Sequence, residues 1–405
     1  MNISTLLRGR ELGGKSQKVR SNPSHSLICS QKVDRTVTQQ RLDSLQLSRI
    51  RSIERRRNGE SVFCLDVDHD QRYLLCGSCD GSVSIVDLDA PTTSKEVACP
   101  VVASVARNTR YGHDYMVVSC QWYPFDSGMF VTASSDKMLK VWDTNVMRPV
   151  ETFPFAERLC HQHWSPVPAT NPLIAVAAGT SNIVLIDLRS GSALQQLKWH
   201  TATVNTVQWS PTDSNILVSG GADGRVLVWD VRSAKSRLKA LSTKAPSGAR
   251  MKKTHVLING LRFSQDGLFL LTIGTDQIMR VWDTAKMREK RKAAFAVPTA
   301  SNFPRKLISF DVTSQGTDGL TVFVPCEDDI LVARPLSSAR RQLLQGHYNP
   351  VNACVYRSNY QQLYSCANDR MVLVWCPEMD ERVETPTTNQ AVLRDLVEDQ
   401  WSDDD

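Results

Sequence analysis

The chain has 405 residues, of which 41% are hydrophobic and 22% charged, and its formal net charge is +6. This composition is that of a globular protein with an ordinary core, and it excludes a chain that is disordered throughout. No apolar run reaches the roughly 18 residues of a membrane-spanning helix, and the 11 scattered cysteines lead us to expect an intracellular protein in a reducing compartment.

The two ends of the chain carry opposite charge. Residues 1–58 contain 13 Lys and Arg against four Asp and Glu, whereas residues 378–405 contain two against ten. Ends that are biased in this way are typical of solvated arms that bind partners. We therefore expect a disordered acidic tail over residues 378–405 and a short helical arm over residues 1–48, with helical segments at 4–12 and 34–47.

A unit recurs seven times between these ends. Each unit contains a turn residue, usually acidic, and the end of an apolar run lies seven positions after it. The pairs are Asp80 with Asp87, Asp136 with Asp143, Thr180 with Asp187, Asp223 with Asp230, Asp276 with Asp283, Glu327 with Arg334, and Asp369 with Cys376. The apolar runs alternate with period two, as half-buried strands do. Because a four-stranded propeller blade needs about 40–45 residues, we predict an all-β, seven-bladed WD-repeat β-propeller over residues 49–377.

Four units share a set of polar side chains. A His opens the unit, a hydroxyl lies four residues before the turn Asp, and a Trp lies six residues after it. The sets are His113, Thr132, Asp136 and Trp142; His200, Ser219, Asp223 and Trp229; His255, Thr272, Asp276 and Trp282; and His347, Ser365, Asp369 and Trp375. In the WD-repeat family, which these units resemble, such a set forms a buried structural hydrogen-bond network. A hydrolase triad is rejected, because an active site would not be repeated four times.

The last unit lacks an outer strand of its own. An open ring would expose strand edges, which proteins avoid. The segment 49–55 lies just before the first unit and alternates suitably, so we predict that it is the strand that closes blade 7. The basic run 49–57 also has a nucleic-acid or nuclear-import interpretation, although charged residues on a closing edge strand explain it equally well.

Residues that could carry chemistry are few. Cys76-x-x-Cys79 has no partner pair at zinc-ribbon spacing. In Cys160-His161-x-His163, neighbouring residues of a strand would face opposite sides, which argues against a metal site. No phosphate-binding loop and no pair of catalytic carboxylates stands out. We therefore expect no enzyme activity, no cofactor, no metal and no small-molecule substrate.

Several stretches go beyond the generic repeat and resemble the Cockayne syndrome A family of WD-repeat proteins. They are Gln121-Trp122-Tyr123-Pro124, Gly128-Met129-Phe130, Leu139 to Asn145, Asp266-Gly267-Leu268, Gly274-Thr275-Asp276, Gly346-His347-Tyr348 and, in the tail, Glu398-Asp399-x-Trp401-Ser402. The resemblance covers about residues 39–405. It thins in the third and sixth units, and residues 287–302 do not match.

The resemblance implies a nuclear, non-catalytic substrate receptor of a cullin-4–RING ubiquitin ligase. Such a receptor binds the cullin-4–RING complex through the damage-specific DNA-binding adaptor protein. It acts in transcription-coupled nucleotide excision repair, with the Cockayne syndrome B-type translocase and stalled RNA polymerase II as partners. No membrane partner is implied.

The resemblance also points to adaptor-binding residues. Receptors of this class often carry Trp-Asp-x-Arg, which here ends at Arg232, and the alternative is that Arg232 is an ordinary solvated loop residue. The stretch 186–189 imitates this motif without the Trp. In the family a helix–loop–helix before the propeller enters a groove of the adaptor, which here implicates four leucines. They are Leu6, Leu7, Leu42 and Leu45. Alternatively, the arm is disordered or packs on its own propeller.

Two other function classes remain open at this stage. One is a WD-repeat scaffold of another nuclear complex, in which Trp-Asp-x-Arg is coincidental. The other is a direct DNA-binding repair factor. Residues 234–253 and 286–292 are basic in part and could contact nucleic acid or acidic partners, but long loops between strands explain them better. Neither segment has the interleaved aromatic residues that support base stacking.

Overall fold

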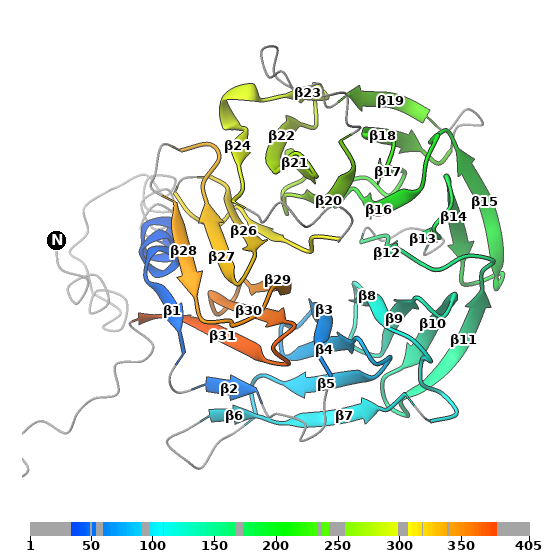
Figure 1. The fold of residues 1–405 in the computed structure, drawn as a ribbon, viewed down its shortest axis with the longest axis horizontal. Helices are drawn as coiled ribbons and strands as arrows, with labels where there is room; N and C mark the ends of the chain where they lie inside the picture. Colours follow the sequence, from blue (N-terminus) through cyan, green and yellow to red (C-terminus); the bar gives the residue numbers. More distant parts are fainter. Residues whose placement is uncertain are drawn as a thin grey trace, which may run out of the picture.

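Seven antiparallel sheets surround a central axis in the computed structural model (Figure 1). The structure describes residues 34–48, 51–53, 60–90, 97–107, 109–166, 173–232, 237–242, 256–298, 307–317, 319–337 and 341–378. Within these residues each sheet has four strands along its path, and the first of them lies nearest the axis. The expected seven-bladed propeller is confirmed.

The first four blades are contiguous in sequence. From the axis outwards, blade 1 contains β3 (Val62–Val67), β4 (Tyr73–Ser78), β5 (Val83–Asp87) and β7 (Val101–Val105), and blade 2 contains β8 (Val117–Trp122), β9 (Met129–Ser134), β10 (Met138–Asp143) and β11 (Arg148–Pro154). Blade 3 contains β12 (His161–Trp164), β13 (Leu173–Ala177), β14 (Asn182–Asp187) and β15 (Ser192–Lys198), and blade 4 contains β16 (Val204–Trp209), β17 (Ile216–Gly221), β18 (Arg225–Asp230) and β19 (Arg237–Ser242).

The last three blades complete the ring. Blade 5 contains β20 (Ile258–Phe263), β21 (Phe269–Gly274), β22 (Ile278–Asp283) and an outer strand in two pieces, β23 (Arg288–Glu289) and β24 (Phe295–Ala296), on either side of the 3-10 helix η1 (Arg291–Ala293). Blade 6 contains β25 (Asp311–Thr313), β26 (Thr321–Cys326), β27 (Asp329–Ala333) and β28 (Gln342–Gln345), and blade 7 contains β29 (Val351–Arg357), β30 (Gln362–Ala367), β31 (Val372–Pro377) and β1 (Leu45–Leu47).

The middle strands are buried on both faces. Every residue of β5 and of β30 is buried, whereas the outer strand β11 is mostly exposed. Each sheet lies between two neighbouring sheets, so both faces of its middle strands meet apolar side chains. The alternation expected from the sequence therefore does not describe these middle strands.

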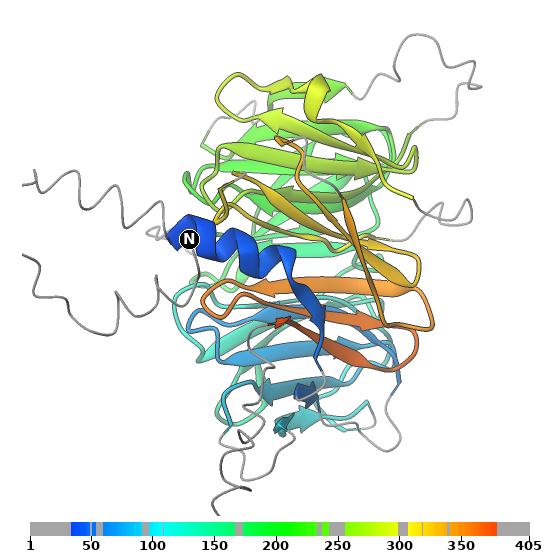
Figure 2. The ribbon, with the colours of Figure 1, turned by 90° about the vertical axis from the view of Figure 1, so that its left-hand side faces the viewer.

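The ring is closed by β1, and this corrects the prediction for residues 49–55. In the observed register Leu45 pairs with Pro377 and Leu47 pairs with Trp375. A helix over residues 34–43 precedes β1 and lies against the edge of the ring, beside strands of the last two blades (Figure 2). Pairing with β31 buries the side chain of Leu45. The position next to β31 therefore suits the leucine-containing segment 45–47 better than the arginine-rich segment 49–55. Residues Arg51–Ile53 form β2 instead, which pairs in parallel with β6 (Val97–Cys99).

None of the helices in the described part of the chain is long and apolar enough to cross a lipid bilayer.

Candidate interaction faces and central channel

The repeated polar sets come together inside the blades. In blade 2, the indole Nε1 of Trp142 donates to Thr132 Oγ1 at 2.8 Å. The imidazole of His113 lies 2.7 Å from Thr132 Oγ1 through Nε2 and 2.7 Å from Asp136 through Nδ1. An indole only donates, so the hydroxyl turns its proton to Nε2, and Nδ1–H donates to the carboxylate. Burial lowers the pKa of His113, in keeping with a neutral ring.

Blade 4 repeats this network. Trp229 donates to Ser219 at 2.8 Å, and His200 contacts Ser219 at 2.8 Å and Asp223 at 3.0 Å. The hydroxyl of Ser219 is fully buried, so it does not face solvent as a nucleophile would.

Blades 5 and 7 complete the comparison. In blade 7, Trp375 donates to Ser365 at 2.8 Å, and His347 contacts Ser365 at 2.8 Å and Asp369 at 2.7 Å. In blade 5, Trp282 donates to Thr272 at 2.9 Å. Asp276 of that blade forms an ion pair with Arg280, a buried residue that the sequence did not single out. His255 lies outside the described residues.

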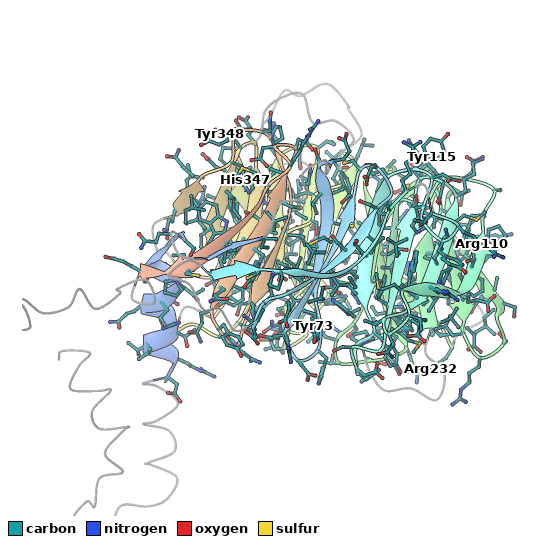
Figure 3. The ribbon with its side chains drawn as sticks, turned by 90° about the horizontal axis from the view of Figure 1, so that it is seen from below. Tyr73, Arg110, Tyr115, Arg232, His347 and Tyr348 are labelled. Carbon is teal, nitrogen blue, oxygen red and sulfur yellow. The ribbon has the colours of Figure 1, made fainter. Side chains whose placement is uncertain are left out.

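Arg232 projects from one face of the ring. Its side chain is 66% exposed, and Figure 3 shows it pointing away from the body. Its Nη2 and Nε atoms donate to the two carboxylate oxygens of Asp230 at 2.9 and 3.1 Å. This ion pair lowers the pKa of Asp230 and fixes the direction of the guanidinium. Arg72 and Asp87 of blade 1 form the same arrangement, at 2.9 Å, although they share no Trp-Asp-x-Arg motif.

The predicted leucine contacts are only partly placed. Leu42 and Leu45 are 0% and 2% exposed and belong to an apolar cluster with side chains of blades 6 and 7, including Phe323 and Trp375. Their prediction as adaptor contacts is corrected, because they pack on their own propeller. Leu6 and Leu7 lie outside the described residues.

The opposite face carries two exposed tyrosines. Tyr115 is 62% and Tyr348 is 81% exposed, and Figure 3 shows both on the side of the ring away from Arg232. Both follow a network histidine closely in sequence, Tyr115 two residues after His113 and Tyr348 one residue after His347. That recurrence is the signal by which sequence reasoning could have found them.

The inner strands join neighbouring blades through side-chain acceptors. At six places a side-chain acceptor on one inner strand accepts a hydrogen bond from a backbone N–H of the neighbouring blade's inner strand. The bonds run from Trp122 to Asp66 (2.8 Å), Trp164 to Gln121 (2.6 Å), Val207 to His161 (3.5 Å), Trp209 to His163 (3.3 Å), Phe263 to Gln208 (2.8 Å) and Tyr356 to Asp311 (2.8 Å). Four of the six acceptors directly precede the last residue of their inner strand, which is aromatic or a valine. The sequence analysis overlooked this position.

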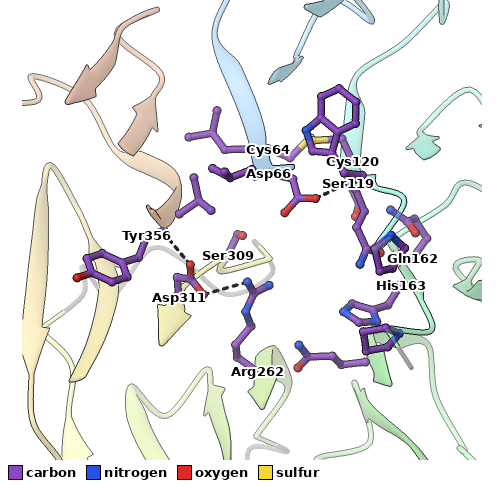
Figure 4. A pocket seen from close by; sticks show the side chains of 18 of the residues that line it. Cys64, Asp66, Ser119, Cys120, Gln162, His163, Arg262, Ser309, Asp311 and Tyr356 are labelled. Carbon is purple, nitrogen blue, oxygen red and sulfur yellow. Dashed lines mark hydrogen bonds and ion pairs between the residues drawn. The ribbon is translucent and has the colours of Figure 1, made fainter. Parts of the chain in front are cut away.

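A polar cavity of about 340 Å³ lies where these strands meet. In Figure 4 the guanidinium of Arg262 points to Asp311, at 2.9 Å, and Asp66 lies across the cavity. Burial raises the pKa of Asp66 to about 7 and lowers the pKa of His161 to about 4. His161 and His163 receive backbone N–H groups of β16. Among the described residues, no three His, Cys, Asp or Glu side chains are grouped as metal ligands.

Comparisons with known proteins agree with this architecture. The family described as WD domain, G-beta repeat matches residues 49–87, 105–143 and 338–376, and the family described as nucleolar protein 10-like, N-terminal domain matches residues 167–317.

Three relatives illustrate the range of similarity. The WD repeat-containing protein ATCSA-1 of Arabidopsis thaliana is 29% identical over 90% of this chain and 94% of its own length. Denticleless protein homolog A of Xenopus laevis is 22% identical over 70% of this chain and 44% of its own length. The ribosome biogenesis protein WDR12 homolog of Drosophila virilis is 32% identical over 42% of this chain and 41% of its own length. With its seven sheets and repeated networks, the chain is a WD-repeat β-propeller protein.

Proposed function

We propose that this protein is the non-catalytic substrate-recognition subunit of a nuclear cullin-4–RING ubiquitin ligase and acts in transcription-coupled nucleotide excision repair. Similarity to ATCSA-1 over nearly the full length of both chains supports this proposal. So does the resemblance of residues 121–145 and 266–276 to the Cockayne syndrome A family. Its partners would be the damage-specific DNA-binding adaptor, the B-type translocase and stalled RNA polymerase II.

The observation that carries the proposal is the exposed guanidinium of Arg232. A guanidinium has five N–H donors in a planar fork that suits carboxylate and carbonyl groups. Asp230 takes two of these hydrogen bonds and holds the fork in one orientation, which lowers the entropic cost of binding a partner. We assign the face that bears Arg232 to the adaptor. The opposite face, with Tyr115 and Tyr348, then remains available to a substrate, and exposed tyrosines are typical of binding surfaces.

The structure changes which part of the N-terminal arm can meet the adaptor. Residues 34–47 form the helix and the closing strand of the propeller itself. The adaptor-docking arm of our proposal is therefore confined to residues 1–33, which include Leu6 and Leu7. Deleting residues 1–47 would remove β1 and would damage the ring, so only the shorter deletion tests docking.

The test is a binding titration of the intact protein with the purified adaptor. Arg232→Asp is expected to weaken binding at least about tenfold, which corresponds to about 1.4 kcal/mol. Arg225→Asp is the matched control, because Arg225 is an exposed residue at the start of β18, whereas Arg232 follows the end of that strand. Deletion of residues 1–33 should also weaken binding. If the folded, intact chain does not bind the adaptor, the receptor proposal is wrong.

The repair assignment has a separate test. Partners captured from nuclear extract should include the translocase and RNA polymerase II after transcription-blocking damage. If the translocase and RNA polymerase II bind the face opposite Arg232, the Arg232→Asp variant should still capture both of them. A direct DNA-binding factor would instead show a DNA affinity that falls steeply with salt in the isolated protein, and that result would favour the alternative.

A further inference from the structure

The outer strand of blade 5 is interrupted, and the interruption forms a groove. After β23 the chain makes the one-turn helix η1 and returns to the sheet as β24, which pairs again with β22. This detour faces the turn 335–337 of blade 6. Between them lies an open groove of about 700 Å³, lined by residues 289–293 and 335–337.

The groove is basic. The stretch 286–292 contains five Lys and Arg residues and one acidic residue, Glu289. The carboxylate of Glu289 lies 3.7 Å from the guanidinium of the buried Arg280. The positive charge of Arg280 therefore partly balances the negative charge of Glu289. Arg288, Arg291 and Lys292 are exposed. The exposed side chain of Leu336 adds an apolar contact at the other wall.

The chain leaves the propeller beside this groove. The backbone N–H of Glu378 donates to the carbonyl of Ser44 at 3.0 Å. The neighbouring residue Asp43 forms an ion pair with Arg334. Arg334 directly precedes the turn 335–337 that lines the groove. The acidic segment that follows Glu378 therefore begins next to a basic surface.

We propose that residues 379–405 bind in this groove of their own chain. The segment has nine acidic and two basic residues, and it also carries Leu393, Leu396 and Trp401, so it offers both charge and apolar side chains. Its 27 residues reach about 90 Å when extended, far more than the path requires. This inference stands independently of the proposed ligase function, because it concerns contacts within one chain.

The test is zero-length carbodiimide crosslinking of the full-length protein, read by mass spectrometry. The reagent joins a lysine amine to a carboxylate in direct contact. We expect crosslinks from Lys290 and Lys292 to acidic residues of the tail, and we expect their yield to fall several-fold at high salt, since exposed charges are screened. A synthetic peptide of residues 379–405 in excess should compete with them.

Charge reversal at the arginines separates docking from mere proximity. Arg288→Glu with Arg291→Glu leaves Lys290 and Lys292 available to the reagent, and should lower the yield at Lys292 about fivefold or more. Lys198→Glu with Lys239→Glu is the matched control, because these are exposed residues on the outer strands of blades 3 and 4. If the charge reversal disturbs folding, the milder double variant Arg288→Gln with Arg291→Gln replaces it. This variant should give a crosslink yield between those of the wild type and the charge reversal.

Three results would overturn the proposal. The first is a tail crosslink yield at Lys290 and Lys292 no higher than at Lys198 and Lys239. The second is an unchanged yield in both arginine double variants, which would mean that the tether alone brings the tail near. The third is a mixed-isotope fraction near one half among the crosslinks in an equal mixture of ¹⁴N and ¹⁵N protein. Random pairing between copies gives about that value, and it would assign the groove to the tail of a second copy.

Discussion

Replacing Thr132 by valine tests whether the repeated networks hold the blades together. The side chain of Thr132 is fully buried. It accepts a hydrogen bond from Trp142 at 2.8 Å and contacts His113 Nε2 at 2.7 Å. Valine has nearly the same shape but no hydroxyl, so the indole N–H and the imidazole nitrogen both lose their partner. Thr132→Ser is the matched control, because it keeps the hydroxyl and removes one methyl group.

The magnitudes of these two changes differ. Leaving one buried polar group unsatisfied costs about 1–3 kcal/mol. Because two groups lose their partner, Thr132→Val should lower the free energy of unfolding by about 2–6 kcal/mol. Thr132→Ser should cost about 1 kcal/mol, the transfer free energy of a buried methyl group with a small cavity. The melting temperature of a propeller of this size changes by about 2 °C for each kcal/mol. The expected drop in melting temperature is therefore about 4–12 °C for the valine variant and about 2 °C for the serine variant.

The assay is thermal unfolding followed by far-UV circular dichroism, supported by urea unfolding. Both variants should retain the native spectrum at low temperature. If Thr132→Val is as stable as Thr132→Ser, the hydrogen bonds in blade 2 make no net contribution and the reasoning is refuted. Scan-rate dependence would identify irreversible unfolding, and unfolding rates would then replace the midpoints in the same comparison.

Three further predictions follow from the fold. The pKa of Asp66 is raised from 3.8 to about 7 by burial, so the native state binds this proton more tightly than the unfolded state does. The stability that the protonated carboxyl contributes is lost as pH rises from about 4 through about 7, and Asp66→Asn should therefore reduce the fall in urea midpoint between pH 5 and pH 8; an unchanged fall would contradict this. Deleting residues 1–47 should give a destabilised protein that associates, whereas deleting residues 1–33 should leave a monomer with the wild-type melting temperature. Size-exclusion chromatography and thermal unfolding measure the two properties. Equal behaviour of the two deletions would mean that β1 does not close the ring. Tyr348→Ala with Tyr115→Ala should leave stability and adaptor binding unchanged but reduce the capture of other nuclear partners several-fold. If this variant captures those partners fully, the face that bears the two tyrosines is not the substrate-binding face.

Local and repeated patterns in the sequence were sufficient to predict the blades. The seven-residue step from each turn to its strand end and the His, hydroxyl, Asp and Trp spacing lie within single units. Short-range geometry determines them, and seven copies reinforce one another. The same spacing allowed even the degenerate third and sixth units to be placed in the correct frame, where β14 and β27 form ordinary strands.

Contacts between distant parts of the chain depended on the tertiary structure. The closing strand is Leu45–Leu47 and not residues 49–55, because only a segment that buries a leucine beside Trp375 fits next to β31. Leu42 and Leu45 were recognisable as apolar positions of the arm, but apolar positions do not specify whether they pack on a partner or on their own propeller.

The sites on the surface and the axis show the same division. The motif that ends at Arg232 was readable, since Asp230 and Arg232 lie two residues apart. The meeting of Asp66, Arg262 and Asp311 around one cavity was not, because these residues come from three blades and their relative positions exist only once the ring has closed. Periodicity along the chain thus determined the blades, while closure of the ring decided which residues face a partner, the channel or the core.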